Sequence, residues 1–508
     1  MSRPAWRCNV AEVLIDDRRV RFGGGPALRS PGRAWSRDEI ADGVGALAGG
    51  LAERGVRRGG RVVLAMPDSP LWVMTFLALT RLGAIVALAS PTTPVRRLRE
   101  AVLRTEPALL VAEDEELIPG VPMLDAHALA RIVEIGHDDP GPAPTRAADL
   151  CYLLLTSGSS GPSKWAVHRH GDIAACLATY GRHVLALRRG DVTWSVAALA
   201  TSYGLGNGCY FPLGAGASTW VTGEAPTPDE AARACAEGGA NVLFGVPTFW
   251  ARLVHHVAEG RVPVSAFAGV RLAVSAGEPL PAAVWHAARD VLGLELVDGL
   301  GSSEATNLYI SNRPGRARPG SVGLGVPGFD FRVVDEDGRG VAAGAPGELL
   351  VRGASVMTGY LDAPTATERA LRGGWLHTGD VVVREADATY RFVGRLGERF
   401  KSGGFWVDPA RVEAALQLHP GVAEVAVSGA PDAGGLARVV AIVVPRNDED
   451  APALRGKLEG LAASELAPHE APRDYVFVDR LPTTASGKVR RRDLERLATE
   501  WGEASPVG

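Results

Sequence analysis

Short apolar runs alternate with longer Ala-rich stretches along this chain, and this alternation limits what the chain can fold into more than any other feature. Runs such as RVVLA at 61–65, NVLF at 241–244 and VRLAV at 270–274 have the length of buried strands. Stretches such as 37–54 have the length of a helix. Strands that alternate with helices form βαβ units and parallel sheets, so we expect an α/β fold.

The chain has 508 residues, more than one hydrophobic core usually supports, so we expect several domains. The clearest candidate boundary lies at Gly394–Gly397 (GRLG), after which a compact α+β pattern of about 110 residues follows. We therefore expect a large, multi-sheet N-terminal domain over residues 1–394 and a small α+β C-terminal domain over residues 395–508.

The composition is that of an ordinary globular protein. A net charge of −4 and a charged content of 22% give no indication of a nucleic acid or a membrane as a partner. Five cysteines without CxxC spacing, and an N-terminus without an apolar signal segment, predict a reduced, cytoplasmic protein. The apolar stretch Leu71–Ala89 is interrupted by Arg81 and Gly83, so we expect a buried helix that leads into a core strand.

Lysine is rare in this chain, and its positions are therefore informative. Of 54 basic residues only four are lysines, at 164, 401, 457 and 488. Lysine is a compact point charge on a flexible stem, whereas arginine is a broad planar fork. Each lysine that persists is a candidate for a role that arginine cannot fill, although we interpret Lys457 as an ordinary surface residue.

The stretch LTSGSSGPSKWAVHRH at 155–170 has the composition of a loop that wraps phosphates. It is not a Walker loop, because Lys164 is preceded by Ser163 and followed by Trp165. It still offers unobstructed backbone N–H groups, several hydroxyl groups and one cation. A flexible Ser/Gly linker is the alternative interpretation of this stretch alone.

Four further stretches have a similar character. DGLGSSEATN (298–307) places Glu304 after a Gly-rich turn, where one carboxylate suits Mg²⁺ whose other ligands are phosphate oxygens. GWLHTGD (374–380) ends on Asp380, whose two oxygens suit a vicinal diol such as ribose. GRLGERFKSGGFWVDPARVE (394–413) and LPTTASGKVRRRDL (481–494) contain Lys401 and Lys488.

In this order and at these separations, the stretches resemble the adenylate-forming superfamily of acyl-CoA synthetases, carrier-protein adenylation domains and luciferases. The resemblance covers essentially the whole chain. Within the superfamily the chain is most similar to benzoate-CoA and related aryl-CoA ligases, through SYGLGN (202–207), GEAPTPD (223–229), FGVPTFWARL (244–253), ISNRPG (310–315) and PRDYVFVDRLP (472–482).

The resemblance implies a two-step reaction with ATP, Mg²⁺ and coenzyme A. A carboxylate attacks the α-phosphate to give an acyl-AMP and pyrophosphate, and a thiol then displaces AMP. It also implies a mobile C-terminal cap that turns on a hinge near Gly397, where the family usually has Asp. We expect an aromatic acid as the substrate, in secondary metabolism or aromatic degradation.

The resemblance assigns roles residue by residue. It implies catalytic roles for Lys488, Glu304 and Lys164, with Glu304 as the metal ligand. The residues implied to bind ATP are Thr156, Ser157, Gly158, Ser159, Ser160, Gly161, Ser275, Ala276, Gly277, Glu278, Asp298, Gly299, Leu300, Gly301, Ser302, Ser303, Asp380 and Arg395. The acid pocket is implied at Ala200, Ser202, Tyr203, Gly204, Asn307 and Tyr309, and the thiol side at Lys401, Ser402, Gly403 and Gly404.

Two departures from the family pattern bear on function. The last Gly of the phosphate loop is replaced by Trp165, which either packs onto the large domain or covers a nucleotide face. The acid pocket has Ser202, Tyr203, Asn307 and Tyr309, whose hydrogen-bonding capacity an unsubstituted phenyl ring would leave unpaired. We therefore expect a hydroxy- or amino-substituted aryl acid.

Three alternatives remain open at this point. The acyl group could be loaded onto the phosphopantetheine of a separate carrier protein instead of coenzyme A. ATP could activate a small oxyanion such as nitrite for attack by an arylamine. The chain could also be a regulatory relative that binds nucleotide or acyl groups without turnover.

Overall fold

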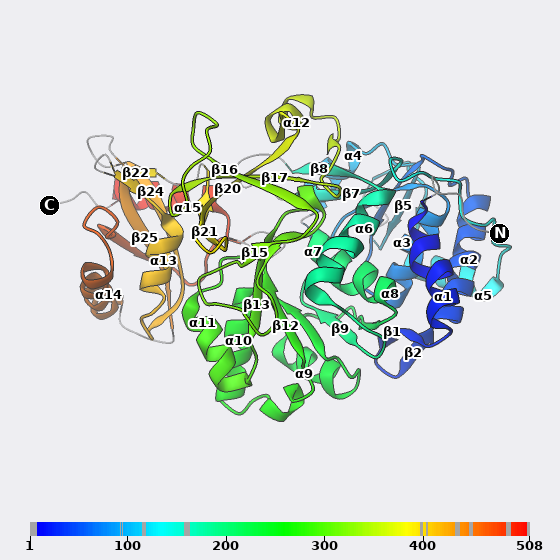
Figure 1. Cartoon of the computed structure of the whole chain (residues 1–508), viewed down its shortest axis with the longest axis horizontal. Coiled ribbons are helices and arrows are strands. Elements are labelled where there is room, and N and C mark those ends of the chain that lie inside the picture. The colour runs from blue at the N-terminus through cyan, green and yellow to red at the C-terminus, as the bar shows by residue number, and fades with distance from the viewer. Residues whose placement is uncertain are drawn as a thin grey trace. The chain divides into compact units, whose positions relative to one another are not determined.

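A computed structural model describes residues 8–91, 93, 95–113, 118–156, 163–396, 400–402, 405–431, 437–446, 451–483 and 489–504 (Figure 1). The described residues form two compact units. The first lies within 1–156, 163–331 and 351–377, and the second within 332–350 and 378–508. The domain boundary after Gly394 stays a prediction, and the hinge residue Gly397 lies outside the described residues.

The first unit contains a seven-stranded sheet in the order β18-β8-β7-β4-β3-β5-β6. Its central strands β7, β4, β3, β5 and β6 are parallel, whereas β8 pairs antiparallel with both β7 and β18. All four residues of β4 and of β5 are buried, as expected for strands covered on both faces. The strands are β3 (Arg61–Ala65), β4 (Ile85–Leu88), β5 (Leu109–Ala112), β6 (Met123–Leu124), β7 (Leu150–Thr156), β8 (Lys164–Arg169) and β18 (Gly359–Tyr360).

A second, nine-stranded sheet has the order β15-β14-β13-β12-β11-β9-β10-β1-β2. Parallel pairing runs from β13 to β1, and the edge strands β14, β15 and β2 are antiparallel. Its strands are β1 (Pro26–Ser30), β2 (Arg33–Ser36), β9 (Val192–Ser195), β10 (Ser218–Trp220), β11 (Val242–Gly245), β12 (Leu272–Ala276), β13 (Leu296–Gly301), β14 (Leu308–Ser311) and β15 (Leu324–Gly325).

Helices cover both sheets of the first unit, and Figure 1 shows α9, α10 and α11 beside β12 and β13. Local chemistry explains where several helices begin. Ser36 and Glu39 form a reciprocal capping box at the start of α2, and Ser69 caps α3 with Pro70 in its first turn. The helices are η1 (Glu12–Asp16), α1 (Asp17–Phe22), α2 (Arg37–Glu53), α3 (Pro70–Arg81), α4 (Val95–Leu103), α5 (Ala126–Ile135), α6 (His170–Cys176), η2 (Leu177–Leu185), α7 (Ser202–Leu205), η3 (Gly206–Tyr210), α8 (Phe211–Ala215), α9 (Pro228–Ala236), α10 (Pro247–Ala258), η4 (Val264–Phe267), α11 (Ala282–Ala287), η5 (Ala288–Leu292), η6 (Ser303–Ala305) and α12 (Pro364–Ala370).

In a third, five-stranded sheet, β20 pairs antiparallel with β19 and β21. Its strands are β16 (Phe329–Val334), β17 (Pro346–Gly353), β19 (Leu371–Arg372), β20 (Trp375–Arg384) and β21 (Tyr390–Arg395). The rest of the second unit is α+β and has its own buried core, as predicted. It comprises β22 (Phe400–Ser402), β23 (Phe405–Val407), α13 (Pro409–Leu416), β24 (Val422–Pro431), β25 (Ala437–Pro445), α14 (Ala451–Glu465), β26 (Asp474–Phe477) and α15 (Arg491–Ala504).

The structure confirms the α/β fold class and the parallel strands that the alternating pattern predicted. The stretch Leu71–Ala89 forms most of α3 and all of β4, as expected. Within the described ranges, we find no helix that is both long enough and apolar enough to span a bilayer.

Candidate active site

The carboxyl ends of β12 and β13 bring together two of the predicted nucleotide-binding stretches. In register, Ser275 pairs with Asp298 and Ala276 with Gly299. Both polar side chains are buried, yet Ser275 Oγ and Asp298 Oδ1 make no hydrogen bond to any described residue. Burial raises the pKa of Asp298 well above its usual value, opposed by a hydrogen bond from the Gly299 amide. Two unpartnered acceptors at neighbouring strand ends are suited to receive N–H groups of a ligand.

The residues that follow β12 form a turn with an unusual backbone. Gly277 has φ of 91°, a conformation that side chains with a Cβ rarely adopt, so glycine is required there. The carboxylate of Glu278 accepts hydrogen bonds from the backbone N and the hydroxyl of Thr248, in the first turn of α10. In the described structure Glu278 therefore stabilises a helix start.

The turn Ser302–Asn307, which we call the Glu304 turn, is held by hydrogen bonds with Ser202, Ser355 and Met357. The Met357 amide donates to the Glu304 carbonyl at 2.8 Å, and the Ser355 hydroxyl donates to the Ala305 carbonyl at 3.0 Å. Asn307 Nδ2 donates to the Ser202 carbonyl at 3.2 Å. A Cβ on Gly301 would lie 2.5 Å from the Asn307 carbonyl oxygen, so the turn closes tightly only because residue 301 is glycine.

Thr306 holds the most strained backbone of this turn. Its φ is 71°, in the left-handed region that β-branched residues rarely adopt. Its buried hydroxyl donates to the Ser355 carbonyl at 3.0 Å, accepts from Tyr152 at 3.3 Å and lies 3.1 Å from His168 Nδ1. Such a conformation persists only where the surroundings enforce it, and here a hydrogen-bond network does so.

His168 anchors that network from behind. The ring is fully buried, Nε2 donates to the Ser303 carbonyl at 2.8 Å, and Nδ1 lies 3.1 Å from the carboxylate of Asp172. Arg169 Nε also donates to Asp172, at 3.0 Å. We did not predict these roles from the sequence, although the spacing of four residues between His168 and Asp172 was a signal available in WAVHRHGD.

The carboxylate of Glu304 is partly exposed and keeps one oxygen unengaged. Oε1 accepts a hydrogen bond from the Tyr360 hydroxyl at 2.8 Å, while Oε2 has no hydrogen-bond or ion-pair partner among the described residues. Groups of three or more His, Cys, Asp or Glu side chains that could hold a metal ion are absent from the part of the chain that is described. A single carboxylate fits Mg²⁺ that arrives with nucleotide phosphates, since Mg²⁺ keeps water and phosphate ligands.

The predicted phosphate loop connects two paired strands. Thr156 ends β7, Lys164 begins β8, the two residues pair in register, and Thr156 Oγ1 donates to the Lys164 carbonyl at 3.2 Å. Lys164 Nζ lies 5.1 Å from the centre of the Tyr360 ring. The loop residues between them, Ser157, Gly158, Ser159, Ser160 and Gly161, lie outside the described residues.

Trp165 belongs to the core of the first unit. Its exposed fraction is 1%, its Nε1 donates to the Ala101 carbonyl at 2.9 Å, and its φ is not positive. Of the two interpretations, packing is confirmed, and the indole lies in the interior between β8 and α4 instead of on the domain surface. It is therefore not free to cover a nucleotide.

The predicted acid-pocket residues lie on and beside α7. Ser202 and Tyr203 are partly exposed; the Ser202 hydroxyl lies 3.3 Å from that of Ser303, and Tyr203 donates weakly to the Gly245 carbonyl at 3.4 Å. Asn307 uses its amide locally, because its Oδ1 accepts from the Leu308 amide at 2.8 Å. The remaining predicted residues, Ala200, Gly204 and Tyr309, are buried.

In the second unit, the residues predicted to bind ribose are neighbours. Asp380 pairs with Arg395 across β20 and β21, and its Oδ1 accepts from Arg395 Nε at 2.8 Å. The Asp380 residue is 3% exposed. On the predicted thiol side, Ser402 is buried in β22, while Gly403, Gly404, the side chain of Lys401 and all of Lys488 lie outside the described residues.

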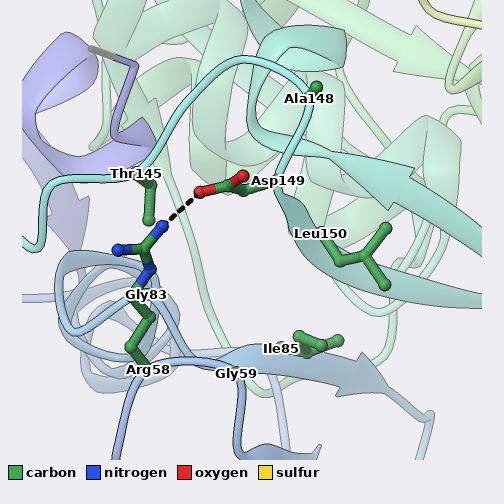
Figure 2. Close-up of a pocket in the computed structure, with 8 residues that line it drawn as sticks. All are labelled: Arg58, Gly59, Gly83, Ile85, Thr145, Ala148, Asp149 and Leu150. Carbon is green, nitrogen blue, oxygen red and sulfur yellow. Dashed lines mark hydrogen bonds and ion pairs between the residues drawn. The ribbon is translucent and has the colours of Figure 1, made fainter.

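A cavity of about 360 Å³ lies elsewhere in the first unit (Figure 2). It is lined by residues at the amino ends of β3, β4 and β7, including Arg58, Ile85 and Leu150. Arg58 and Asp149 bond to each other across it at 2.6 Å. None of its lining residues is a predicted site residue, so this cavity is separate from the predicted site.

Comparison with known proteins supports the family resemblance that the sequence motifs indicated. The family described as AMP-binding enzyme matches residues 15–361, and the AMP-binding enzyme C-terminal domain matches residues 411–488. The benzoate–CoA ligase of Thauera aromatica and the anthranilate–CoA ligase of Pseudomonas aeruginosa are each 33% identical to this chain, with 96% of both sequences covered in each comparison. A crystal structure of an anthranilate CoA ligase in complex with anthranoyl-AMP superposes with a TM-score of 0.92 at 29% identity, covering 99% of both chains. Because a family model spans residues 15–361 and two relatives match nearly end to end, this chain belongs to the AMP-binding enzyme family and is an AMP-forming acid–thiol ligase.

Proposed function

We propose that this protein joins a hydroxy- or amino-substituted aromatic acid to coenzyme A at the expense of ATP. The named acids of its relatives, benzoate and anthranilate among them, support the aryl class. The observation that carries the ATP half is a pair of buried acceptors at neighbouring strand ends, Ser275 Oγ and Asp298 Oδ1, which have no hydrogen-bond partner among the described residues. They suit the amino group of adenine.

The proposed first step needs positioning and charge neutralisation more than a covalent nucleophile. The acid's carboxylate attacks the α-phosphate, and pyrophosphate leaves. Mg²⁺, when bound, would neutralise charge on the phosphates, with Glu304 Oε2 as its protein ligand. Lys164 would face the same phosphates, and the Asp380 carboxylate would accept hydrogen bonds from the ribose hydroxyls. A thiol then displaces AMP.

A polar ring substituent is supported by two side chains on the same helical segment. Tyr203 in α7 and Asn207 in η3 are four residues apart, and the Tyr203 hydroxyl donates only a weak hydrogen bond, to the Gly245 carbonyl at 3.4 Å. Asn207 is fully buried and both its amide atoms lack a partner within the described ranges. A buried amide without a partner costs about 1–3 kcal/mol, which a hydroxyl or amino group on the ring would offset and an unsubstituted ring would not.

The test is a panel of acids incubated with MgATP, with and without coenzyme A, in which pyrophosphate, AMP and product mass are followed. Benzoate, its hydroxy and amino derivatives, and cinnamic acids form the panel. We expect kcat/KM for the best substituted acid to exceed that for benzoate by about tenfold or more. A clear preference for benzoate would refute the proposed substituent.

The same assay separates the acceptors. A relative named p-hydroxybenzoic acid–AMP ligase, 34% identical over 465 residues, favours adenylate formation as a second candidate activity. If acyl-AMP accumulates and coenzyme A gives no thioester, the second candidate replaces the first. Lys488→Ala should abolish adenylation while it spares thioester formation from supplied acyl-AMP, and adenylation that survives this change contradicts the role of Lys488.

A further inference from the structure

Tyr360 contacts two side chains to which the proposed function gives roles, although it lies far from both in the sequence. Its hydroxyl donates to Glu304 Oε1 at 2.8 Å. The face of its ring lies 5.1 Å from Lys164 Nζ, within the range of a cation–π contact. One side chain thus fixes both the carboxylate and the ammonium group.

The backbone of Tyr360 is held from two directions. In β18 it pairs with Ala166 of β8, two residues after Lys164. Its amide donates to Thr367 Oγ1 at 2.8 Å, and the next amide, of Leu361, donates to the Trp165 carbonyl at 2.9 Å. The ring therefore projects from a fixed point beside the start of β8.

The contacts with Tyr360 leave one oxygen of Glu304 and the charge of the Lys164 ammonium group available to a ligand. Tyr360 engages Glu304 Oε1, and Oε2 has no described partner. Lys164 makes no ion pair with any described residue, and the ring contact orients its ammonium group without neutralising it. A hydrogen bond to a metal-binding carboxylate typically changes metal affinity by about 10–100-fold when it is lost.

We propose that Tyr360 is a positioning residue for the triphosphate end of the nucleotide site. It orients the Glu304 carboxylate through its hydroxyl and the Lys164 ammonium through its ring. This inference rests on the proposed roles of Glu304 and Lys164. It predicts that Tyr360 affects ligands that have β and γ phosphates and does not affect AMP.

The experiment measures the affinity of the full-length protein for MgATP and for AMP by isothermal titration calorimetry, without any acid. Tyr360→Phe removes the hydroxyl and keeps the ring, whereas Tyr360→Leu removes both. Tyr475→Phe is the matched control, because that hydroxyl is buried in the core of the second unit and has no partner among the residues that the structure describes. Glu304→Gln reports on the role of Glu304 itself, and thermal unfolding of each variant reports on folding.

We expect Tyr360→Phe to weaken MgATP binding about tenfold and to leave AMP binding and the melting temperature close to wild type. Tyr360→Leu should weaken MgATP binding further. The double variant Tyr360→Phe, Glu304→Gln should bind MgATP no more weakly than Glu304→Gln alone, because the Tyr360 hydroxyl acts through Glu304.

The outcomes distinguish an error in the proposed role of Tyr360 from an error in the proposed role of Glu304. If Glu304→Gln weakens MgATP binding and Tyr360→Phe does not, the positioning role is wrong. An equal loss for AMP and MgATP, or a large fall in melting temperature with Tyr360→Phe, also overturns it, since a merely structural residue behaves in that way. If Glu304→Gln leaves MgATP binding unchanged, the proposed role of Glu304 fails first.

Discussion

Replacing Trp165 tests whether its indole stabilises the core or covers a bound nucleotide. Trp165 is 1% exposed and packs with the core between β8 and α4. Its Nε1 donates to the carbonyl of Ala101, one of the last four residues of α4, whose carbonyls lack partners within their own helix. The indole therefore fills core volume and also caps a helix.

The expected loss of stability on replacing Trp165 follows from these two contributions. Trp165→Ala removes a buried ring, which costs about 3–5 kcal/mol, and leaves the Ala101 carbonyl without a donor, which costs about 1–3 kcal/mol. Trp165→Phe keeps most of the apolar volume, so we expect it to lower the free energy of unfolding by about 2–3 kcal/mol. At roughly 2–4 °C per kcal/mol, its melting temperature should fall by about 4–12 °C.

The assay combines calorimetric melting with MgATP titration well below the transition. Trp501→Phe serves as the control, because Trp501 in α15 is 37% exposed and its loss should leave the melting temperature unchanged. We expect Trp165→Phe to bind MgATP within about twofold of wild type. A variant that melts normally but binds MgATP severalfold more weakly would refute the reasoning, because that pattern requires a ring that covers the nucleotide.

Three further predictions concern His168, the buried carboxyl of Asp68, which accepts a hydrogen bond from the Leu199 amide, and Asp380. His168→Leu should lower the free energy of unfolding by about 2–5 kcal/mol in urea titrations, because the Ser303 carbonyl and the Asp172 carboxylate each lose a partner. His168→Gln should lower it less, and equal losses for the two variants would contradict the role of these hydrogen bonds. Burial raises the pKa of Asp68 from 3.8 to about 6, so the contribution of the protonated Asp68 to the free energy of unfolding is complete below pH 3.8 and is lost as the pH rises through about 6. Asp68→Asn should therefore raise the melting temperature at pH 8 in calorimetric melts, and this gain should shrink toward pH 4. Asp380→Asn should weaken AMP binding about tenfold in calorimetric titrations, because a charged acceptor for the ribose hydroxyls is lost, and unchanged AMP affinity would contradict the ribose assignment.

Several site positions were predictable because they depend on local order along the chain. Short apolar runs ended in Gly- and Ser-rich turns at SAGE and DGLGSSE, and parallel strands align their carboxyl ends. The family resemblance implied that Ser275 and Asp298 both bind ATP, and the two residues pair directly. Asp380 and Arg395 are likewise adjacent, joined by one antiparallel pairing.

Other features depend on contacts that no spacing reveals. Asn307 was predicted to offer hydrogen-bonding capacity to a substrate, but its amide already bonds the Ser202 carbonyl and the Leu308 amide. A polar side chain in a turn is often engaged by the nearby backbone, and the sequence does not distinguish that use from ligand binding. In the proposed function, the polar ring substituent is therefore assigned to Tyr203 and Asn207, since both Asn207 amide atoms lack a partner among the described residues.

By itself the sequence determined the α/β class, the family and the order of the predicted nucleotide-binding stretches, because apolar periodicity and glycine-rich turns are local properties of the chain. Only the tertiary structure decided that Trp165 lies in the core and that His168 and Tyr360 hold the Glu304 turn. These three roles come from segments that pair across β7, β8 and β18, as much as 196 residues apart between Lys164 and Tyr360. Long-range strand pairing creates such contacts, so they exist only once the sheet has formed.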